Sequence, residues 1–378
     1  MKSFIPIAIL TALLPAVAMA QAPGRQKRTV TDEEVMRVHR STILIDTHND
    51  VTSFTVDGMD IGKSSAPAHM TDIPRMKQGG MSAQFFAAYV AASYAKDNRS
   101  ADRALQMIDT VLHDIVEKYP DEFLFVTSSS GIRKAHEQHK IAALIGIEGG
   151  HAIEDSLRLL RDFYDLGVRY MTLTHANSNG WADSSGDANK PNNGLSPFGK
   201  EVVREMNRLG MMVDVAHVSD KTFWDALETS QAPIFSSHSS CRALADVPRN
   251  MTDQMIAAMA KKGGVIQINF SCGFLKAGAG AAGSIGGAPR ATLADVVKHI
   301  NHVVEIAGVD AVGLGSDFDG ITCAPEGLDS VDKWPNLTRA LLEEGYTAAE
   351  IRKIYGENIL RVMAAVEQIA EQTAKQMR

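Results

Sequence analysis

The chain has 378 residues, of which 45% are hydrophobic and 22% are charged, and its formal net charge is −7. Because globular domains contain roughly 100–200 residues, this length allows one large domain or two ordinary ones. The high apolar content argues against a disordered chain. The acidic balance, without a long basic run, argues against a nucleic-acid partner.

The N-terminus is typical of an export signal. Lys2 supplies a positive charge, Phe4–Val17 form an apolar stretch, and Ala18-Met19-Ala20 matches a small-residue cleavage site. The apolar stretch is shorter than the roughly 20 residues that a membrane-spanning helix needs. We therefore expect a signal peptide over residues 1–20, cleavage after Ala20, no stable membrane span, and a mature protein that is periplasmic or secreted.

Three cysteines, Cys241, Cys272 and Cys323, follow the expected cleavage site. Because their number is odd, at most one intramolecular disulfide can form. A chain of this length can bury enough apolar surface to fold without disulfides, and the sequence leaves open whether any of the three is paired.

Short apolar runs alternate with longer segments of helical periodicity along the chain. This alternation predicts repeated β-α units and a parallel sheet. The expected strands are Thr42–Asp46, Ala83–Val90, Ile141–Ile147, Tyr170–Leu173, Met211–Val215, Pro233–Ser236, Val265–Asn269 and Ala311–Leu314. The expected helices begin at the capping-box sequence Thr31-Asp32-Glu33-Glu34 and continue as Ala101–Lys118, Glu154–Leu166, Pro197–Arg208, Asp220–Glu228, Asp253–Lys261, Leu293–Ala307, Thr347–Tyr355 and Asn358–Lys375. Eight strands with intervening helices predict a (β/α)₈ TIM barrel, with a doubly wound open sheet as the alternative.

The chain between the seventh and eighth expected strands contains a Gly/Ala-rich segment, Ala277–Ala288, without periodicity. This composition predicts a flexible loop. In a barrel, the loop would border the face at which the strands end.

Six of the eight expected strands are followed directly by His, Asp or Glu. These residues are His48 and Asp50, Glu148, His175, His217, His238, and Asp317 with Asp319. Because the carboxyl ends of parallel barrel strands converge on one face, we expect them to form a common site. Other histidines lie on charged helical segments; His136, His139, His299 and His302 are interpreted as parts of solvated helix faces.

The residue types at the strand ends favour a metal centre. Imidazole and carboxylate groups without a thiolate motif suit Zn²⁺ and comparable divalent ions. His48 and Asp50 stand two residues apart and point the same way in an extended strand, and Glu148 has two oxygens that could bridge two ions. Five ligands are too many for one open tetrahedral site but suit two metals that share a carboxylate, and such a pair would make hydroxide available near neutral pH.

Together these motifs resemble the membrane (renal-type) dipeptidases, peptidase family M19, which belong to the amidohydrolase-like metal-dependent barrels. The resemblance runs from about Val38 to Ala364. The shared order of the motifs makes it specific. They are Asp46-Thr47-His48-Asn49-Asp50, Thr71-Asp72-Ile73-Pro74-Arg75, Gly146-Ile147-Glu148-Gly149-Gly150, Tyr170-Met171-Thr172-Leu173-Thr174-His175, Trp181-Ala182-Asp183, Asp214-Val215-Ala216-His217-Val218-Ser219, Ser236-Ser237-His238-Ser239-Ser240, Arg249-Asn250, Gly315-Ser316-Asp317-Phe318-Asp319-Gly320 and Gly356-Glu357-Asn358.

The resemblance implies two Zn²⁺ per chain, bridged by Glu148 and a hydroxide. One ion would be bound by His48 and Asp50, and the other by His217 and His238. The resemblance further implies a single catalytic barrel domain over 21–378, with an N-terminal helix and C-terminal helices, and a possible homodimer.

Three further residues receive roles through the resemblance. His175 would bind the substrate and stabilise the tetrahedral intermediate, Arg249 would hold the C-terminal carboxylate of the substrate, and Asp317 would transfer a proton to the leaving amine. The implied reaction is hydrolysis of L-L and L-D dipeptides by attack of the metal-bridging hydroxide. The alternatives are an N-acyl amino acid hydrolase or another amidohydrolase, and a non-catalytic binding protein with a relic metal site.

The sequence departs from the family pattern in places. Ala176 and Asn177 stand where mammalian relatives have a cysteine, so that disulfide is not expected here. Ser271 stands where an aromatic residue often lies, which leaves the side-chain preference of the substrate pocket open. Cys241, three residues after His238, is interpreted as a partly buried thiol and not as a ligand.

Overall fold

The computed structural model describes residues 25–279 and 290–376. The expected signal peptide, residues 1–20, and residues 280–288 of the expected Gly/Ala-rich loop lie outside the described residues. Within these ranges, no helix combines the length and the apolar character needed to cross a membrane.

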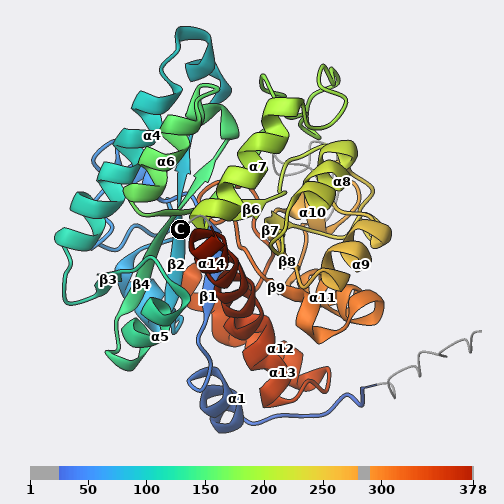
Figure 1. Ribbon diagram of the computed structural model, residues 1–378. Helices are drawn as coiled ribbons and strands as arrows, with labels where there is room; N and C mark the ends of the chain where they lie inside the picture. The colour runs from blue at the N-terminus through green and yellow to red at the C-terminus, as the bar shows by residue number, and fades with distance from the viewer. Residues whose placement is uncertain (1–24, 280–289, 377–378) are drawn as a thin grey trace, which may run out of the picture.

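The strands of the described chain form one parallel sheet with helices around it (Figure 1). The hydrogen-bonded order is β1-β2-β4-β5-β6-β7-β8-β9, and β3 pairs with β4 beside this path. The strands are β1 Ile45–Asn49, β2 Ala83–Tyr89, β3 Phe123–Phe125, β4 Ile141–Glu148, β5 Val168–Thr172, β6 Met212–Asp214, β7 Phe235–Ser239, β8 Val265–Ile268 and β9 Val312–Leu314.

The sheet closes on itself between its first and last strands. Asn49 at the end of β1 forms a parallel bridge with Phe318, which follows β9. The amide of Asp317 donates to the carbonyl of His48 at 3.0 Å, and the amide of Asp50 donates to the carbonyl of Phe318 at 2.9 Å. The expected (β/α)₈ TIM barrel is therefore confirmed, and the open sheet is excluded.

One strand, β3, was not predicted. It pairs with the first residues of β4, Ile141–Ala143, whereas β5 pairs with β4 only from Ile145 onward. With three residues, of which only Phe123 is buried, β3 is too short to produce a periodic pattern in the sequence.

Several of the helices begin where the sequence places capping residues. The side chains of Thr31, Ser196, Ser219 and Thr252 each accept a hydrogen bond from a backbone amide in the first turn. The helices are α1 Asp32–His39, α2 Thr52–Thr55, α3 Ile73–Gln78, α4 Ser100–Asp109, α5 Ser129–Glu137, α6 Leu157–Asp165, α7 Pro197–Leu209, α8 Asp220–Thr229, α9 Asp253–Lys261, α10 Cys272–Leu275, α11 Leu293–Ala307, α12 Trp334–Glu343, α13 Ala348–Arg352 and α14 Asn358–Gln376. The expected helix Ala101–Lys118 is α4 followed by a π-helical segment, Thr110–Glu117. The helices α2, α3, α5, α10 and α12 are not among the predicted ranges.

Large side chains fill the barrel interior at its amino end. Phe85, Leu144, Tyr170 and Phe235 point inward and form one buried cluster with residues of α14. Figure 1 shows α14 lying across this end of the barrel. Because this end is sealed by apolar packing, the polar residues at the strand carboxyl ends have only the opposite face on which to meet.

Two features concern residues that the sequence left open or misassigned. Cys272 and Cys323 form a disulfide, which joins the segment after β8 to the segment after β9, and Cys241 is a buried free thiol. His299 does not lie on a solvated face: its side chain is buried, accepts from the amide of Cys241 and bonds the carbonyl of Leu275. Lys298 and Glu305, the charged neighbours that indicated a solvated face, are exposed, whereas the ring of His299 is turned toward Cys241 and Leu275.

Candidate metal centre

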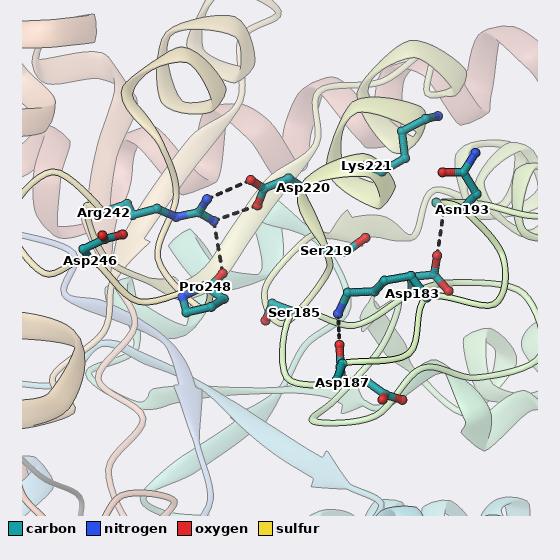
Figure 2. Close-up of a pocket in the computed structure, with 13 residues that line it drawn as sticks. Asp183, Ser185, Asp187, Asn193, Ser219, Asp220, Lys221, Arg242, Asp246 and Pro248 are labelled. Carbon is teal, nitrogen blue, oxygen red and sulfur yellow. Dashed lines mark hydrogen bonds and ion pairs between the residues drawn. The ribbon is translucent and has the colours of Figure 1, made fainter.

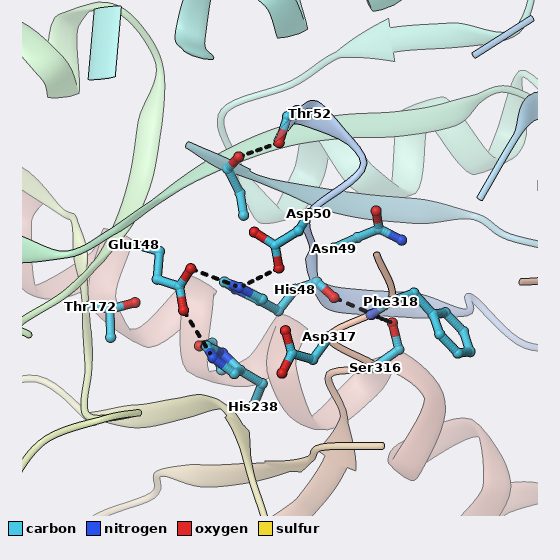
Figure 3. Close-up of polar contacts among 12 residues, drawn as sticks. His48, Asn49, Asp50, Thr52, Glu148, Thr172, His238, Ser316, Asp317 and Phe318 are labelled. Carbon is cyan, nitrogen blue, oxygen red and sulfur yellow. Dashed lines mark hydrogen bonds and ion pairs between the residues drawn. The ribbon is translucent and has the colours of Figure 1, made fainter. Parts of the chain in front are cut away.

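The side chains proposed from the sequence for the site gather at the carboxyl end of the barrel. They come from the ends of β1, β4 and β7 and from the segments that follow β1, β5, β6, β7 and β9. They are His48, Asp50, Glu148, His175, His217, His238, Arg249 and Asp317. Figure 3 shows His48, Asp50, Glu148, His238 and Asp317 facing one another.

Glu148 lies between the imidazoles and turns a different oxygen to each side. Its Oε2 lies 3.6 Å from Nε2 of His48. Its Oε1 lies 2.9 Å from Nε2 of His217, 3.3 Å from Nε2 of His238 and 3.7 Å from Nε2 of His175. One carboxylate thus contacts two groups of nitrogen donors, as the sequence led us to expect.

The donor atoms suit divalent metal ions. Three overlapping groups have their ligand atoms within 4.8 Å of one another; they are His48-Glu148-His238, Glu148-His175-His217 and His48-Asp50-Asp317. Nε2 of His48 is buried, lies 3.3 Å from Oδ2 of Asp50 and has no hydrogen-bond partner. A buried nitrogen without a partner beside two carboxylates is costly in a protein unless a cation takes up the lone pair.

The environment of Glu148, His217 and His238 favours the protonation states that metal binding needs, whereas at His48 the neighbouring Tyr170, Glu148 and Asp50 outweigh burial and raise the pKa well above its usual value. Burial opposes ionisation of Glu148, but the neighbouring His175 and His48 outweigh it and hold the pKa of this carboxyl well below its usual value. Burial lowers the pKa values of His217 and His238, and the charge of Arg249 adds to this effect. The ionised carboxylate of Glu148 beside the neutral imidazoles of His217 and His238 is the state that binds a metal ion.

Residues outside the ligand set orient two of the imidazoles. The phenol of Tyr170 lies 2.7 Å from Nδ1 of His48 and donates to the carbonyl of Thr47 at 3.0 Å. The hydroxyl of Ser237 lies 2.7 Å from Nδ1 of His238. In both imidazoles Nδ1 is thereby engaged, and Nε2 faces Glu148.

The backbone around the centre is tightly constrained. His217 and Asp317 adopt left-handed φ values of 64° and 62°, which are uncommon for residues other than glycine. A Cβ atom at Gly320 would lie 2.3 Å from Oδ2 of Asp50 and 2.6 Å from Oδ1 of Asp317. Gly320 therefore allows the chain to pass directly behind two of the carboxylates.

Asp317 and Arg249 lie at the edge of the cluster. The side-chain amide of Asn269 donates to Oδ2 of Asp317 at 2.8 Å. Burial raises the pKa of Asp317 well above its usual value, and the carboxylates of Asp50 and Glu148 contribute to this rise. Arg249 donates to Oγ of Ser239 and to the carbonyl of His238, at 2.7 and 2.8 Å.

Sequence reasoning assigned no role to several residues of the centre. Tyr170, Asp214 and Ser237 lay within the family motifs, and Asn269 and Tyr89 lay at the ends of expected strands. The ring of Tyr89 packs on that of His175, with 4.8 Å between the ring centroids. The sequence offered one indication of a role for these residues, namely that they lie in or next to the motifs that carry the ligands. A hydroxyl or amide at such a position does not indicate which atom it contacts until the fold is known.

A cavity of about 520 Å³ lies among segments that follow the strands at the same end of the barrel (Figure 2). Its walls come from the segment after β5, the start of α8 and the segment after β7. Within it, Arg242 donates two hydrogen bonds of 2.7 Å to the carboxylate of Asp220. None of the metal-centre carboxylates or imidazoles lines this cavity, so it is separate from the cluster.

Known structures share this fold over most of the chain. The probable dipeptidase PvdM from Pseudomonas aeruginosa is 24% identical, with a TM-score of 0.82 over 90% of this chain and 99% of its own. A metallo peptidase from Rhodobacter sphaeroides, liganded with a phosphinate mimic of the dipeptide L-Ala-D-Ala, is 26% identical, with a TM-score of 0.77 over 86% of this chain and 100% of its own.

A third similar structure, dipeptidase AC, is described as a metallo peptidase of family M19. It is 27% identical, with a TM-score of 0.78 over 86% of this chain and 99% of its own. The family model for membrane dipeptidase (peptidase family M19) matches residues 32–377. The chain therefore belongs to the membrane dipeptidase family, peptidase family M19, and is a metallo-dipeptidase, a hydrolase that acts on dipeptides.

Proposed function

We propose that the protein hydrolyses L-L and L-D dipeptides with two Zn²⁺ ions that share Glu148. The observation that carries this proposal is the position of the Glu148 carboxylate, with Oε2 toward His48 and Oε1 toward His217 and His238. In this proposal His48 and Asp50 hold one ion, and His217 and His238 hold the other. When bound, the two ions supply activation of water and polarisation of the scissile carbonyl.

Asp317 is suited to proton transfer. Its carboxyl is buried and is held by Asn269. A carboxylate held beside the ligands can take a proton from the attacking water and deliver it to the nitrogen of the departing amino acid. The ring of His175 lies next to Glu148 and is partly exposed, so a substrate bound at the centre could reach it. In the proposal, His175 donates a hydrogen bond to the substrate oxygen that becomes negative in the tetrahedral intermediate.

Arg249 is suited to hold the carboxylate of the substrate. Two of its nitrogens are fixed by His238 and Ser239, and its Nε is buried without a hydrogen-bond partner. A guanidinium held in this way offers its remaining N–H donors in a fixed plane, which matches a carboxylate. A requirement for this contact would confine the enzyme to very short peptides.

Cleavage of L-D dipeptides is supported by the likeness to the Rhodobacter enzyme, whose ligand mimics L-Ala-D-Ala. The test is metal analysis of the purified protein together with hydrolysis of L-Ala-L-Ala, L-Ala-D-Ala and their N-acetylated forms. The proposal predicts two zinc ions per chain and cleavage of the free dipeptides. Cleavage of the acetylated compounds alone would instead indicate an N-acyl amino acid hydrolase.

We also propose that the mature protein is exported after cleavage following Ala20. The Cys272–Cys323 disulfide supports this location, because disulfides persist mainly in oxidising compartments such as the periplasm. N-terminal sequencing of the protein from fractionated cells tests the cleavage site. The homodimer stays an expectation from the family, and light scattering of the purified protein measures it.

A further inference from the structure

His238 is connected through a hydroxyl to a buried carboxylate. Oγ of Ser237 lies 2.5 Å from Oδ2 of Asp214 and 2.7 Å from Nδ1 of His238. Asp214 also accepts from the amides of Ala216 and Ser237 through its Oδ1, at 3.0 and 2.8 Å. Because the carboxylate only accepts, the hydroxyl proton of Ser237 points to Asp214, and the hydroxyl oxygen accepts Nδ1–H of His238.

His48 is fixed in the same tautomer by a different group. The phenol of Tyr170 donates to the carbonyl of Thr47, which can only accept. The phenol oxygen is then free to accept Nδ1–H of His48 at 2.7 Å. Tyr170 is fully buried, so no solvent competes for these two contacts of its phenol.

We propose that these two contacts are separate positioning devices, each acting on one metal ion. The Asp214–Ser237 pair sets the affinity of the position formed by His217 and His238, and Tyr170 sets the affinity of the position formed by His48. The inference rests on the proposed two-metal centre. Groups that orient a ligating imidazole typically change metal affinity about 10- to 100-fold when they are removed.

Asp214→Asn is the sharpest probe, because it changes one atom. An amide that turned its NH₂ toward Ala216 and Ser237 would set donors against their backbone N–H groups, which is unfavourable. The NH₂ therefore takes the place of Oδ2 and faces the hydroxyls of Thr172 and Ser237, which both donate to Oδ2 in the wild type. The Ser237 hydroxyl then donates its own proton to Nδ1 of His238. The imidazole proton of His238 then moves to Nε2, so the lone pair of Nε2 is no longer available to the metal ion.

The test is competitive titration of each protein with Zn²⁺ against a chromogenic chelator, with metal stoichiometry by elemental analysis. The wild type should bind two ions, and Asp214→Asn and Ser237→Ala should weaken one of them about 10- to 100-fold. Ser237→Thr, which keeps the hydroxyl, should restore the affinity. Ser230→Ala is a matched control, since it removes a buried hydroxyl that bonds Ala232 away from the centre.

Double variants show which ion is affected. In a double variant with His238→Ala, Asp214→Asn should cause no further loss of zinc affinity, because both substitutions act on the same metal position. In a double variant with His48→Ala, it should weaken zinc binding by as much as it does alone. Tyr170→Phe should show the reverse pattern. Tyr355→Phe, which removes the hydroxyl of another buried phenol bonded to Thr338, is its control and should bind two ions as the wild type does.

The outcomes separate this inference from the proposed function. A wild type that hydrolyses dipeptides with two ions, together with a folded Asp214→Asn variant that binds both with unchanged affinity, would overturn the inference alone. Equal weakening of both ions in that variant would also overturn it. A wild type that binds fewer than two ions would contradict the proposed centre and the inference with it. Far-ultraviolet circular dichroism verifies that each variant is folded.

Discussion

The side-chain amide of Asn269 donates a 2.8 Å hydrogen bond to Oδ2 of Asp317. The two residues follow neighbouring strands, β8 and β9, and the disulfide Cys272–Cys323 joins the same two segments a few residues farther on. The proton-transferring carboxylate that we propose is therefore held from its own strand and from the adjacent one. This arrangement fixes which oxygen of Asp317 remains available toward the metal ligands.

We expect Asp317→Asn to lower kcat for L-Ala-D-Ala by about 10²–10⁴-fold, because an amide cannot accept and return a proton. The effect on KM and on bound zinc should be much smaller. Asn269→Ala should lower kcat less, since it frees the carboxyl without removing it. Steady-state kinetics and elemental analysis of both variants provide the measurement, and full activity of Asp317→Asn would remove this residue from its role.

Gly320→Ala should abolish most activity while the barrel stays folded. The added methyl would lie 2.3 Å from Oδ2 of Asp50 and 2.6 Å from Oδ1 of Asp317, so both carboxylates must move. Gly180→Ala is a suitable control because its methyl would meet Oδ2 of Asp155 at 2.9 Å, where the carboxylate is exposed and can turn aside. Equal activity of the two variants would contradict a close fit behind the centre.

Arg249→Ala should raise KM for dipeptides about 10- to 100-fold, the effect of losing a hydrogen bond to a charged group. Arg249→Lys should rescue little, because an ammonium lacks the planar fork. With dipeptide amides as substrates, the wild type and both variants should converge. Arg242→Lys serves as the control, since Arg242 is bound to Asp220 in the separate cavity. A KM difference that persists with the amides would place Arg249 elsewhere in the reaction.

The stability of the fold should decrease as pH falls from about 6.5 toward 4. Burial lowers the pKa of His299 to about 4, so the folded protein keeps this ring neutral while the unfolded chain binds a proton. The contribution of His299 to the free energy of unfolding is therefore full above about pH 6.5, the pKa of an unfolded histidine. It decreases as the pH falls from there to about 4, by up to about 1.4 kcal/mol per pH unit. His299→Gln should flatten the pH dependence of the unfolding free energy relative to the wild type.

The sequence was sufficient to predict the barrel and the residues that meet at its carboxyl face. Strand ends carry this information because parallel strands bring their carboxyl ends together, so a residue type and a strand boundary suffice. His48, Glu148 and His238 converge as expected. Their roles as ligands stay a prediction until metal is measured.

The features that the sequence did not reveal depend on contacts between distant segments. The Asp214–Ser237 pair, the Tyr170 phenol and the burial of His299 each arise from packing between different elements. The short strand β3 was missed because three residues show no period, and the Cys272–Cys323 pairing could not be derived from an odd number of cysteines. In each case the deciding quantity is a distance that exists only in the folded chain.

The central claim is that Glu148 is shared by two zinc ions in an active dipeptidase. The most direct test removes Zn²⁺ from the purified enzyme and then returns it. Bound zinc, by elemental analysis, and the rate of L-Ala-D-Ala hydrolysis are measured at each stage. We expect two ions per chain, loss of activity on removal and recovery on return, and a Glu148→Gln variant that is folded, deficient in zinc and inactive. Full activity of pure enzyme without any transition-metal ion would contradict the claim.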